Sequence, residues 1–182
     1  DELFGGYPRY RWFAVARRLQ SALPAGLREG LLLPSARALV GRGRWRVRAE
    51  NLLSERDDAS RQVRWVANLM PETRAALYRA DLKPLAAGGL AERVLQDHFA
   101  SGSRNGADII HCLMMADIKT WLVDDVLTKR DRMSMAASVE ARVPFLDHGL
   151  LEFVSALSAG IKLRTLGTKR LLRQAMRGLL PA

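Results

Sequence analysis

Two acidic residues precede a pair of glycines at the start of the sequence. The run reads Asp1-Glu2-Leu3-Phe4-Gly5-Gly6-Tyr7, and glycine lets a backbone turn tightly or approach a ligand closely. Mg²⁺ is usually held by one or two carboxylates together with the phosphates of a substrate. The acidic pair is therefore a candidate magnesium site. An acidic turn that is simply exposed to water fits the same residue types.

Two cations stand near the other end of the sequence, at Lys169 and Arg170. Thr168 is a candidate helix N-cap, and the apolar positions that follow it have helical spacing. Lys169 and Arg170 would then lie in the first helical turn, where the helix dipole disfavours cations. A phosphate bound there would explain them, although a solvated surface lysine fits as well.

A third charged stretch runs from Asp124 to Asp147. It begins as a helix and becomes an extended run that ends at Pro144, because the residue before a proline avoids the helical region. In that run apolar residues alternate with Glu140 and Arg142, so the carboxylate and the guanidinium share one face. We expect them to form an ion pair, and an ion-paired turn between two helices is the simplest interpretation.

The spacing of apolar residues elsewhere predicts a mainly α-helical chain that must position these groups. The sequence predicts a loop at 101–106 and a short extended piece at 161–164. The helices are predicted at 8–23, Asp57–Met70, Pro71–Tyr78, Leu90–Phe99, Asp108–Leu127 and His148–Leu157. The Asp108–Leu127 helix is the most apolar and should be central, with His111 and Cys112 lining the core.

Composition limits the class of protein. The chain has 182 residues, 48% hydrophobic and 26% charged, which is typical of a globular domain. No apolar run is long enough to cross a bilayer, and the single Cys112 fits a reducing compartment, so a cytoplasmic location is expected. The net charge of +10 permits nucleic-acid binding, but the arginines are spread along the chain. We rank that function well below binding of a nucleotide or pyrophosphate.

Taken together, the three stretches resemble the synthetase domain of glutamine-dependent asparagine synthetases. Asp1 to Tyr7 is similar to the end of that family's acidic-glycine motif. Asp131-Arg132-Met133-Ser134-Met135 and Glu140 to Asp147 are similar to its most recognisable segment, and Thr168 to Arg173 to its lysine-bearing helix.

The resemblance implies the C-terminal, helical portion of an α/β ATP-pyrophosphatase-type synthetase domain, here a single partial domain over 1–182. That family uses Mg²⁺ and ATP to convert the side-chain carboxylate of aspartate into an acyl-adenylate, which ammonia from glutamine then attacks. By motif match Asp1 would be a Mg²⁺ ligand, Lys169 would be catalytic and contact the phosphates, and Arg170 would bind ATP together with Lys169. The residues expected in the wall of the active site are Glu2, Asp131, Arg132, Glu140, Arg142 and Asp147.

The family's pyrophosphate loop and its glutaminase domain have no counterpart in these 182 residues. We therefore expect this chain to be part of a larger protein, to be inactive alone and to need those regions as partners; a homodimer stays open. Relatives that form β-lactams, cyclise peptides or modify polysaccharides are alternatives for the acceptor substrate. A basic helical module that binds nucleic acid is the alternative from another class.

Overall fold

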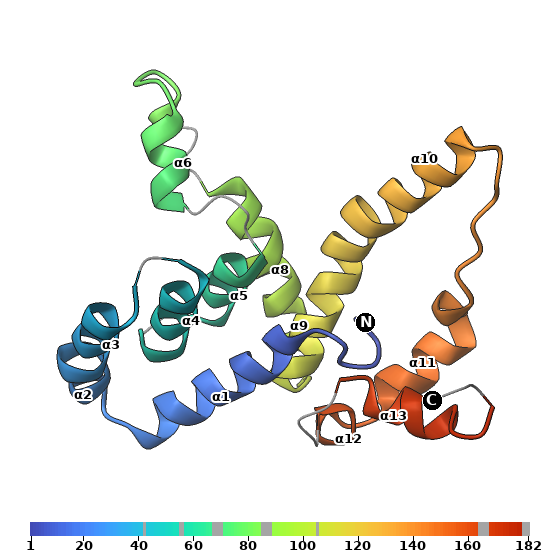
Figure 1. Ribbon diagram of the computed structural model, residues 1–182, viewed down its shortest axis with the longest axis horizontal. Coiled ribbons are helices and arrows are strands. Elements are labelled where there is room, and N and C mark those ends of the chain that lie inside the picture. Colours follow the sequence, from blue (N-terminus) through green and yellow to red (C-terminus); the bar gives the residue numbers. More distant parts are fainter. Residues whose placement is uncertain are drawn as a thin grey trace. The chain divides into compact units, whose positions relative to one another are not determined.

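The structure is a computed structural model, and it describes residues 1–41, 43–54, 57–66, 71–84, 89–104, 106–163 and 168–179. Within these ranges the regular elements are helices, without a β-strand, which confirms the prediction of a mainly α chain (Figure 1). The elements are α1 (Pro8–Ala22), α2 (Ala25–Leu27), the π-helix η1 (Arg28–Leu32), α3 (Leu33–Leu39), α4 (Arg44–Leu53), α5 (Asp58–Val66), α6 (Pro71–Leu77), α8 (Leu90–Arg104), α9 (Ile109–Asp117), the π-helix η2 (Ile118–Leu127), α10 (Thr128–Ala136), the 3₁₀ helix η3 (Pro144–Leu146), α11 (His148–Ala156), α12 (Ala159–Leu163) and α13 (Arg170–Ala175).

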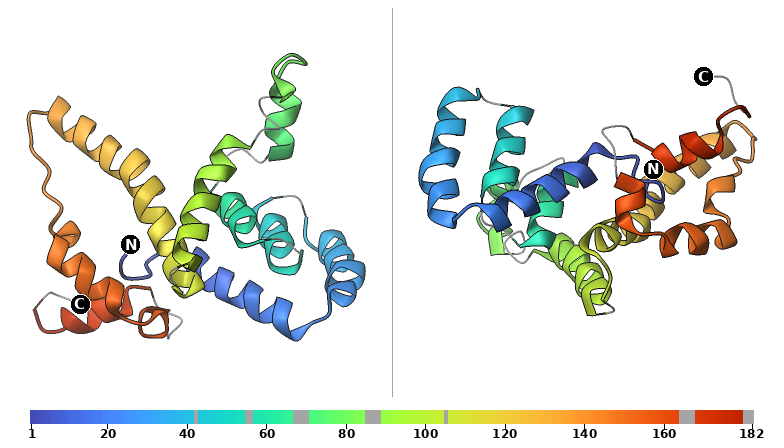
Figure 2. Two further views of the ribbon diagram at one scale, coloured as in Figure 1. Left: turned by 180° about the vertical axis from the view of Figure 1, so that it is seen from behind. Right: turned by 90° about the horizontal axis from the view of Figure 1, so that it is seen from below.

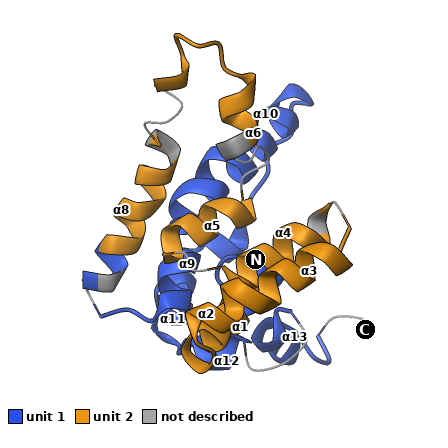
Figure 3. Cartoon of the chain, turned by 90° about the vertical axis from the view of Figure 1, so that its left-hand side faces the viewer, with its two compact units in different colours: residues 1–11, 101–182 blue, residues 12–100 orange. Residues whose placement is uncertain are grey.

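The chain forms two compact units (Figure 3). Unit 1 combines Asp1–Arg11 with Ser101–Ala182, and unit 2 is Trp12–Ala100. Every residue to which the sequence assigns a chemical role lies in unit 1. None of the described helices is both long and apolar enough to cross a membrane.

Unit 1 is built on an uninterrupted helical run through α9, η2 and α10 (Figures 1 and 2). The run begins at Asp108, whose side chain accepts a hydrogen bond of 2.8 Å from the backbone N–H of Ile110. Such a cap satisfies a donor that has no partner within the helix. Most of α9 is buried, including Cys112 and Leu113, as its apolar composition predicts.

A small apolar core in unit 1 anchors the acidic-glycine turn. Leu3 and Phe4 are about 95% buried and share this core with Val154 of α11. The partly buried residues packed against it come from η3, α11 and α13, namely Leu146, Leu150, Leu151, Leu171 and Leu172. Two apolar residues between Glu2 and Gly5 thus fix the turn against the helices that precede and follow the lysine segment.

Unit 2 has its own core around Phe13, Ala16 and Val63. Arg61 is fully buried there; its guanidinium lies over the Phe13 ring, bonds the backbone oxygen of Asn51 and pairs with Asp58 at 3.1 Å. Of the predicted Asp57–Met70 helix, the structure shows Asp58–Val66, and 67–70 lie outside the described residues.

Two segments that the sequence predicts to be non-helical are wholly or partly helical. The predicted loop at 101–106 begins as helix, because α8 continues to Arg104. Gly102 explains part of this: a Cβ there would lie only 2.7 Å from Cys112 Sγ, so the glycine lets α8 approach α9 closely. The predicted extended piece at 161–164 is helical through Leu163 in α12, and Arg164 lies outside the described residues.

Candidate active site

The structure brings together Asp1 and Lys169, the two residues that the resemblance singles out at opposite ends of the chain. Lys169 Nζ lies 2.5 Å from Asp1 Oδ1, and the two side chains are 39% and 34% exposed. Because both side chains are partly exposed, either one can leave this ion pair and bind a charged ligand instead. This pair is the centre of the candidate site.

Lys169 is not in the first turn of a helix, as the sequence predicts, but is the residue before α13. Its backbone is left-handed, with φ 54° and ψ 33°. That conformation is uncommon for a residue with a side chain, and among the described non-glycine residues only Ser138 in the turn after α10 shares a positive φ. Thr168 is therefore not the cap; Arg170 is the first helical residue of α13.

The two glycines of the turn face different neighbours. At Gly6 a Cβ would overlap the carboxylate of Asp1 and lie 2.8 Å from Lys169 Cε. At Gly5, which has φ +63°, a Cβ would lie 2.8 Å from Leu163 Cδ2 and 3.4 Å from the carbonyl oxygen of Lys162. Gly6 thus leaves room for the Asp1–Lys169 pair, and Gly5 leaves room for α12.

Glu2 turns inward, away from the solvent that Asp1 meets. It is 5% exposed and accepts a hydrogen bond of 2.8 Å from the Tyr7 hydroxyl, which accepts one of 3.2 Å from Trp121 Nε1. Burial alone would raise the pKa of Glu2, but hydrogen bonds from its own backbone and from Tyr7 lower it overall. Burial, followed by the bond to the carboxylate, raises the pKa of Tyr7 to about 12. Glu2 is therefore a buried anion that supports the turn.

A second buried cluster ties the start of α1 to α9. Asp117 is 1% exposed and pairs with Arg9 at 2.9 Å, while the Tyr10 hydroxyl donates to the same carboxylate oxygen at 2.6 Å. The Arg9 guanidinium also stacks on the Tyr7 ring at 4.0 Å. Burial raises the pKa of Asp117 although Arg9 opposes this effect. The turn is thus held to α9 by charge as well as by its apolar core.

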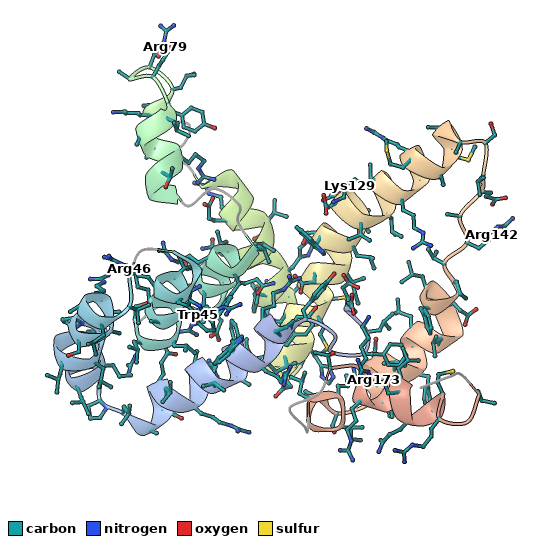
Figure 4. All side chains as sticks on the ribbon, in the orientation of Figure 1. Trp45, Arg46, Arg79, Lys129, Arg142 and Arg173 are labelled. Atoms are coloured by element: carbon teal, nitrogen blue, oxygen red, sulfur yellow. The ribbon has the colours of Figure 1, made fainter. Side chains whose placement is uncertain are left out.

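The other predicted wall residues are exposed, and no described contact joins them to the Asp1–Lys169 pair. Glu140 and Arg142 form the predicted ion pair, at 2.9 Å, on the extended segment between α10 and α11, where their side chains are 67% and 83% exposed (Figure 4). Asp147 caps α11 by accepting a hydrogen bond of 3.0 Å from the Leu150 N–H. Asp131 and Arg132 lie on exposed positions of α10.

Sequence reasoning missed the residues that support the site, above all Lys162. It placed this lysine on an extended strand, whereas it lies 3% exposed in α12. Arg9 and Asp117 were not paired either, although an acid within an otherwise apolar helix is a signal that it needs a buried partner. His111 is partly buried, as predicted, but it also makes hydrogen bonds.

Comparison with known proteins gives one family over the whole chain. The family model described as asparagine synthase matches residues 1–182. The chain belongs to the asparagine synthase family. A glutamine-hydrolyzing asparagine synthetase, number 1 of Bacillus subtilis (strain 168), is 32% identical over 185 residues, which cover 100% of this chain and 27% of that protein. A putative glutamine-hydrolyzing asparagine synthetase of Mycobacterium tuberculosis (strain ATCC 25618 / H37Rv) is 33% identical over 182 residues, or 26% of its length.

A shorter match, 44% identical over 61 residues, is to asparagine synthetase 3 of Bacillus subtilis (strain 168). No solved structure gives a significant match. The chain spans about a quarter of the length of the asparagine synthetases that it matches in full. The two relatives that it matches in full carry the name glutamine-hydrolyzing asparagine synthetase, one of them as putative.

Proposed function

We propose that the full-length protein amidates aspartate in an ATP-dependent reaction. The carboxylate of aspartate attacks the α-phosphorus of ATP, pyrophosphate leaves, and ammonia released from glutamine then displaces AMP from the acyl carbon. The 182-residue chain supplies one side of the site for the first step. The rest of the parent supplies the pyrophosphate loop and the glutaminase.

The observation that carries this proposal is the geometry of Lys169. Its left-handed backbone and the missing side chain at Gly6 allow the ammonium to sit against Asp1 while remaining 39% exposed. A fixed cation of this kind stabilises the negative charge that grows on the phosphates as the bond to pyrophosphate breaks. Asp1 holds the ammonium in place until the phosphates arrive.

Magnesium fits this arrangement as an ion held by few protein ligands. Among the described residues no cluster of three or more acidic, histidine or cysteine side chains could hold a metal, and Glu2 is turned inward to Tyr7. Asp1 would be the carboxylate that this chain provides, which suits an ion that binds mainly through substrate phosphates. When bound, the ion would offset phosphate charge.

The test is to incubate the full-length protein with Mg²⁺, ATP, glutamine and aspartate and to measure AMP, pyrophosphate and asparagine. AMP that forms only with aspartate, together with asparagine, is the expected result. Lys169→Ala should lower kcat by at least about 10²-fold, the usual loss when one charge-stabilising donor is removed. Lys129→Ala is a matched control, because Lys129 is exposed on α10 and pairs with Asp125 (Figure 4).

If AMP forms with another carboxylate and not with aspartate, the adenylation part of the proposal stands and the acceptor substrate is a different acid. Absence of AMP with every carboxylate offered would reject the proposal. In the basic segment at 37–48, Arg37 and Arg46 share the one carboxylate of Glu50, at 3.0 and 3.4 Å, so this acid offsets only part of their charge. DNA retention that falls steeply with salt would favour the nucleic-acid alternative. Arg42 and the side chain of Arg44 lie outside the described residues.

A further inference from the structure

Lys162 is a buried lysine with an unusual partner. It is 3% exposed in α12, and its amine lies 3.3 Å from Nε2 of His111 on α9. Burial lowers the pKa of Lys162 to about 8. The acids near the site pair elsewhere: Asp1 with Lys169 and Asp117 with Arg9. Among the described residues no carboxylate is paired with Lys162, and a buried ammonium without one is costly, so a role in the site would explain why a lysine stands here.

One imidazole nitrogen lies within hydrogen-bond distance of both ends of the segment that contains this lysine. His111 Nε2 lies 2.9 Å from the carbonyl oxygen of Leu157 as well as 3.3 Å from the Lys162 amine. We call His111, Leu157 and Lys162 the His111 clip. A neutral imidazole nitrogen either donates to the carbonyl or accepts from the ammonium, so the position of its proton is coupled to the charge of Lys162.

The segment that the clip fastens packs directly beneath the acidic-glycine turn. A Cβ at Gly5 would meet the Leu163 side chain and the Lys162 carbonyl first, and then Met114 Cε of α9 at 3.5 Å. The next described residues along the chain lead to Lys169, and α12 packs against α13. The clip therefore fixes the surface against which the turn rests and the start of the segment that carries the catalytic lysine.

Helix α9 holds both halves of the site. His111 fastens α12, and Asp117, six residues later, fastens Arg9 and Tyr10 behind the turn. At about 100° per residue these two positions lie roughly 120° apart around the helix. One helix can therefore set the distance between Asp1 and Lys169, because Asp117 holds the segment that follows Asp1 and His111 holds the segment that leads to Lys169.

We propose that Lys162 is a positioning residue: through the His111 clip it holds the α12 segment against the turn and so keeps the Lys169 ammonium opposite Asp1. It does not touch substrate. The activity test of this proposal rests on the proposed function above, whereas the structural test depends only on the Asp1–Lys169 pair.

The structural test measures how fast Lys169 is acetylated by a short pulse of acetic anhydride, with peptide mass spectrometry of the full-length protein. Lys162→Met keeps the length of the side chain and removes the amine. We expect Lys169 to react several-fold faster in this variant, approaching its rate in Asp1→Asn, where the partner charge is gone. Lys119→Met, at an exposed position of η2, should leave the rate unchanged.

The activity test measures aspartate-dependent AMP formation by the same variants. Lys162→Met should lower kcat about 10-fold with little change in KM for ATP, because a misplaced lysine weakens the transition state more than the ground state. A thermal melt checks that the variant folds. A wild-type acetylation rate of Lys169 in folded Lys162→Met would overturn the proposal. If the wild-type protein makes no AMP with aspartate, the proposed function fails, and the acetylation rates still decide whether Lys162 positions Lys169.

Discussion

Adding one methyl group at Gly6 should separate activity from stability. The Cβ of Gly6→Ala would overlap Asp1 Oδ1 and lie 2.8 Å from both Asp1 Cγ and Lys169 Cε. These atoms belong to the ends of side chains, so the carboxylate and the lysine can retreat, by about 1 Å, without moving the backbone. A displacement of about 1 Å in a catalytic group can lower a rate about 10²-fold. We expect a loss of that size in aspartate-dependent AMP formation.

The free energy of unfolding should hardly change. The Asp1–Lys169 pair is more than one-third exposed on both sides, and such pairs contribute about 0.2–1 kcal/mol. Gly6 is not among the glycines with positive φ, so alanine fits its backbone and can return about 0.4–1 kcal/mol by restricting the unfolded chain. The two effects nearly cancel, and urea unfolding should give the wild-type midpoint.

Two other glycines serve as controls. Gly5→Ala should destabilise by about 1 kcal/mol or more, since Gly5 has φ +63° and its Cβ would press on Leu163. Gly30→Ala, where nothing lies within 4 Å, should leave activity unchanged and, because Gly30 is helical in η1, should stabilise by about 0.5–1 kcal/mol. The reasoning is refuted if Gly6→Ala retains full activity, or if it loses activity only because the urea midpoint falls. Acetylation of Lys169 gives the same comparison without any substrate.

Three further substitutions test the buried supports. Asp117→Ala should destabilise the full-length protein by about 3 kcal/mol in urea unfolding, because it leaves the largely buried Arg9, whose side chain is 14% exposed, without its charge partner; a change below about 1 kcal/mol would contradict the pair. Tyr7→Phe removes a donor from the buried Glu2 carboxylate and should cost about 1.5–3 kcal/mol in the same assay, with an unchanged midpoint as the contrary result. The pKa of Lys162 is lowered to about 8 in the folded protein, whereas it is about 10.4 in the unfolded chain. Between these pH values the unfolded state binds more protons than the folded state. The free energy of unfolding should therefore rise from about pH 8 to about pH 10, by up to roughly 3 kcal/mol. Melts across this pH range should show that rise in the wild type and a smaller rise in Lys162→Met; equal slopes would count against a buried amine.

The sequence predicts most helices because apolar spacing is a local property. The boundaries of α1, α6 and α11 fall within a residue or so of the predicted ones. The failure at 101–104 has a tertiary cause. Serine and glycine are typical of loops, yet Gly102 sits in α8 because its missing Cβ accommodates Cys112. A packing contact between two helices overrides the local preference.

The pairing of Asp1 with Lys169 could be reached only through resemblance to a family, since no periodicity relates residues at opposite ends of a chain. The left-handed backbone of Lys169 had no signal at all, because lysine does not favour that conformation. Lys162 was hidden for a related reason. Its neighbours Ile161 and Leu163 suggest a strand, and only the His111 contact in the folded protein shows why a charged residue is buried there.

The residues that support the site share one helix, α9. Asp1 and Lys169 are partly exposed and would attract each other by no more than about 1 kcal/mol if they were free. That attraction is too weak to hold two segments from opposite ends of the chain at one distance. The contacts of Asp117, which is 1% exposed, and of the partly buried His111 clip are better shielded from water, and Asp117 and His111 both belong to α9. The distance between the two exposed charges is therefore set by the buried helix α9. Because the pair itself is weak, Asp1 and Lys169 can separate and each can bind a ligand.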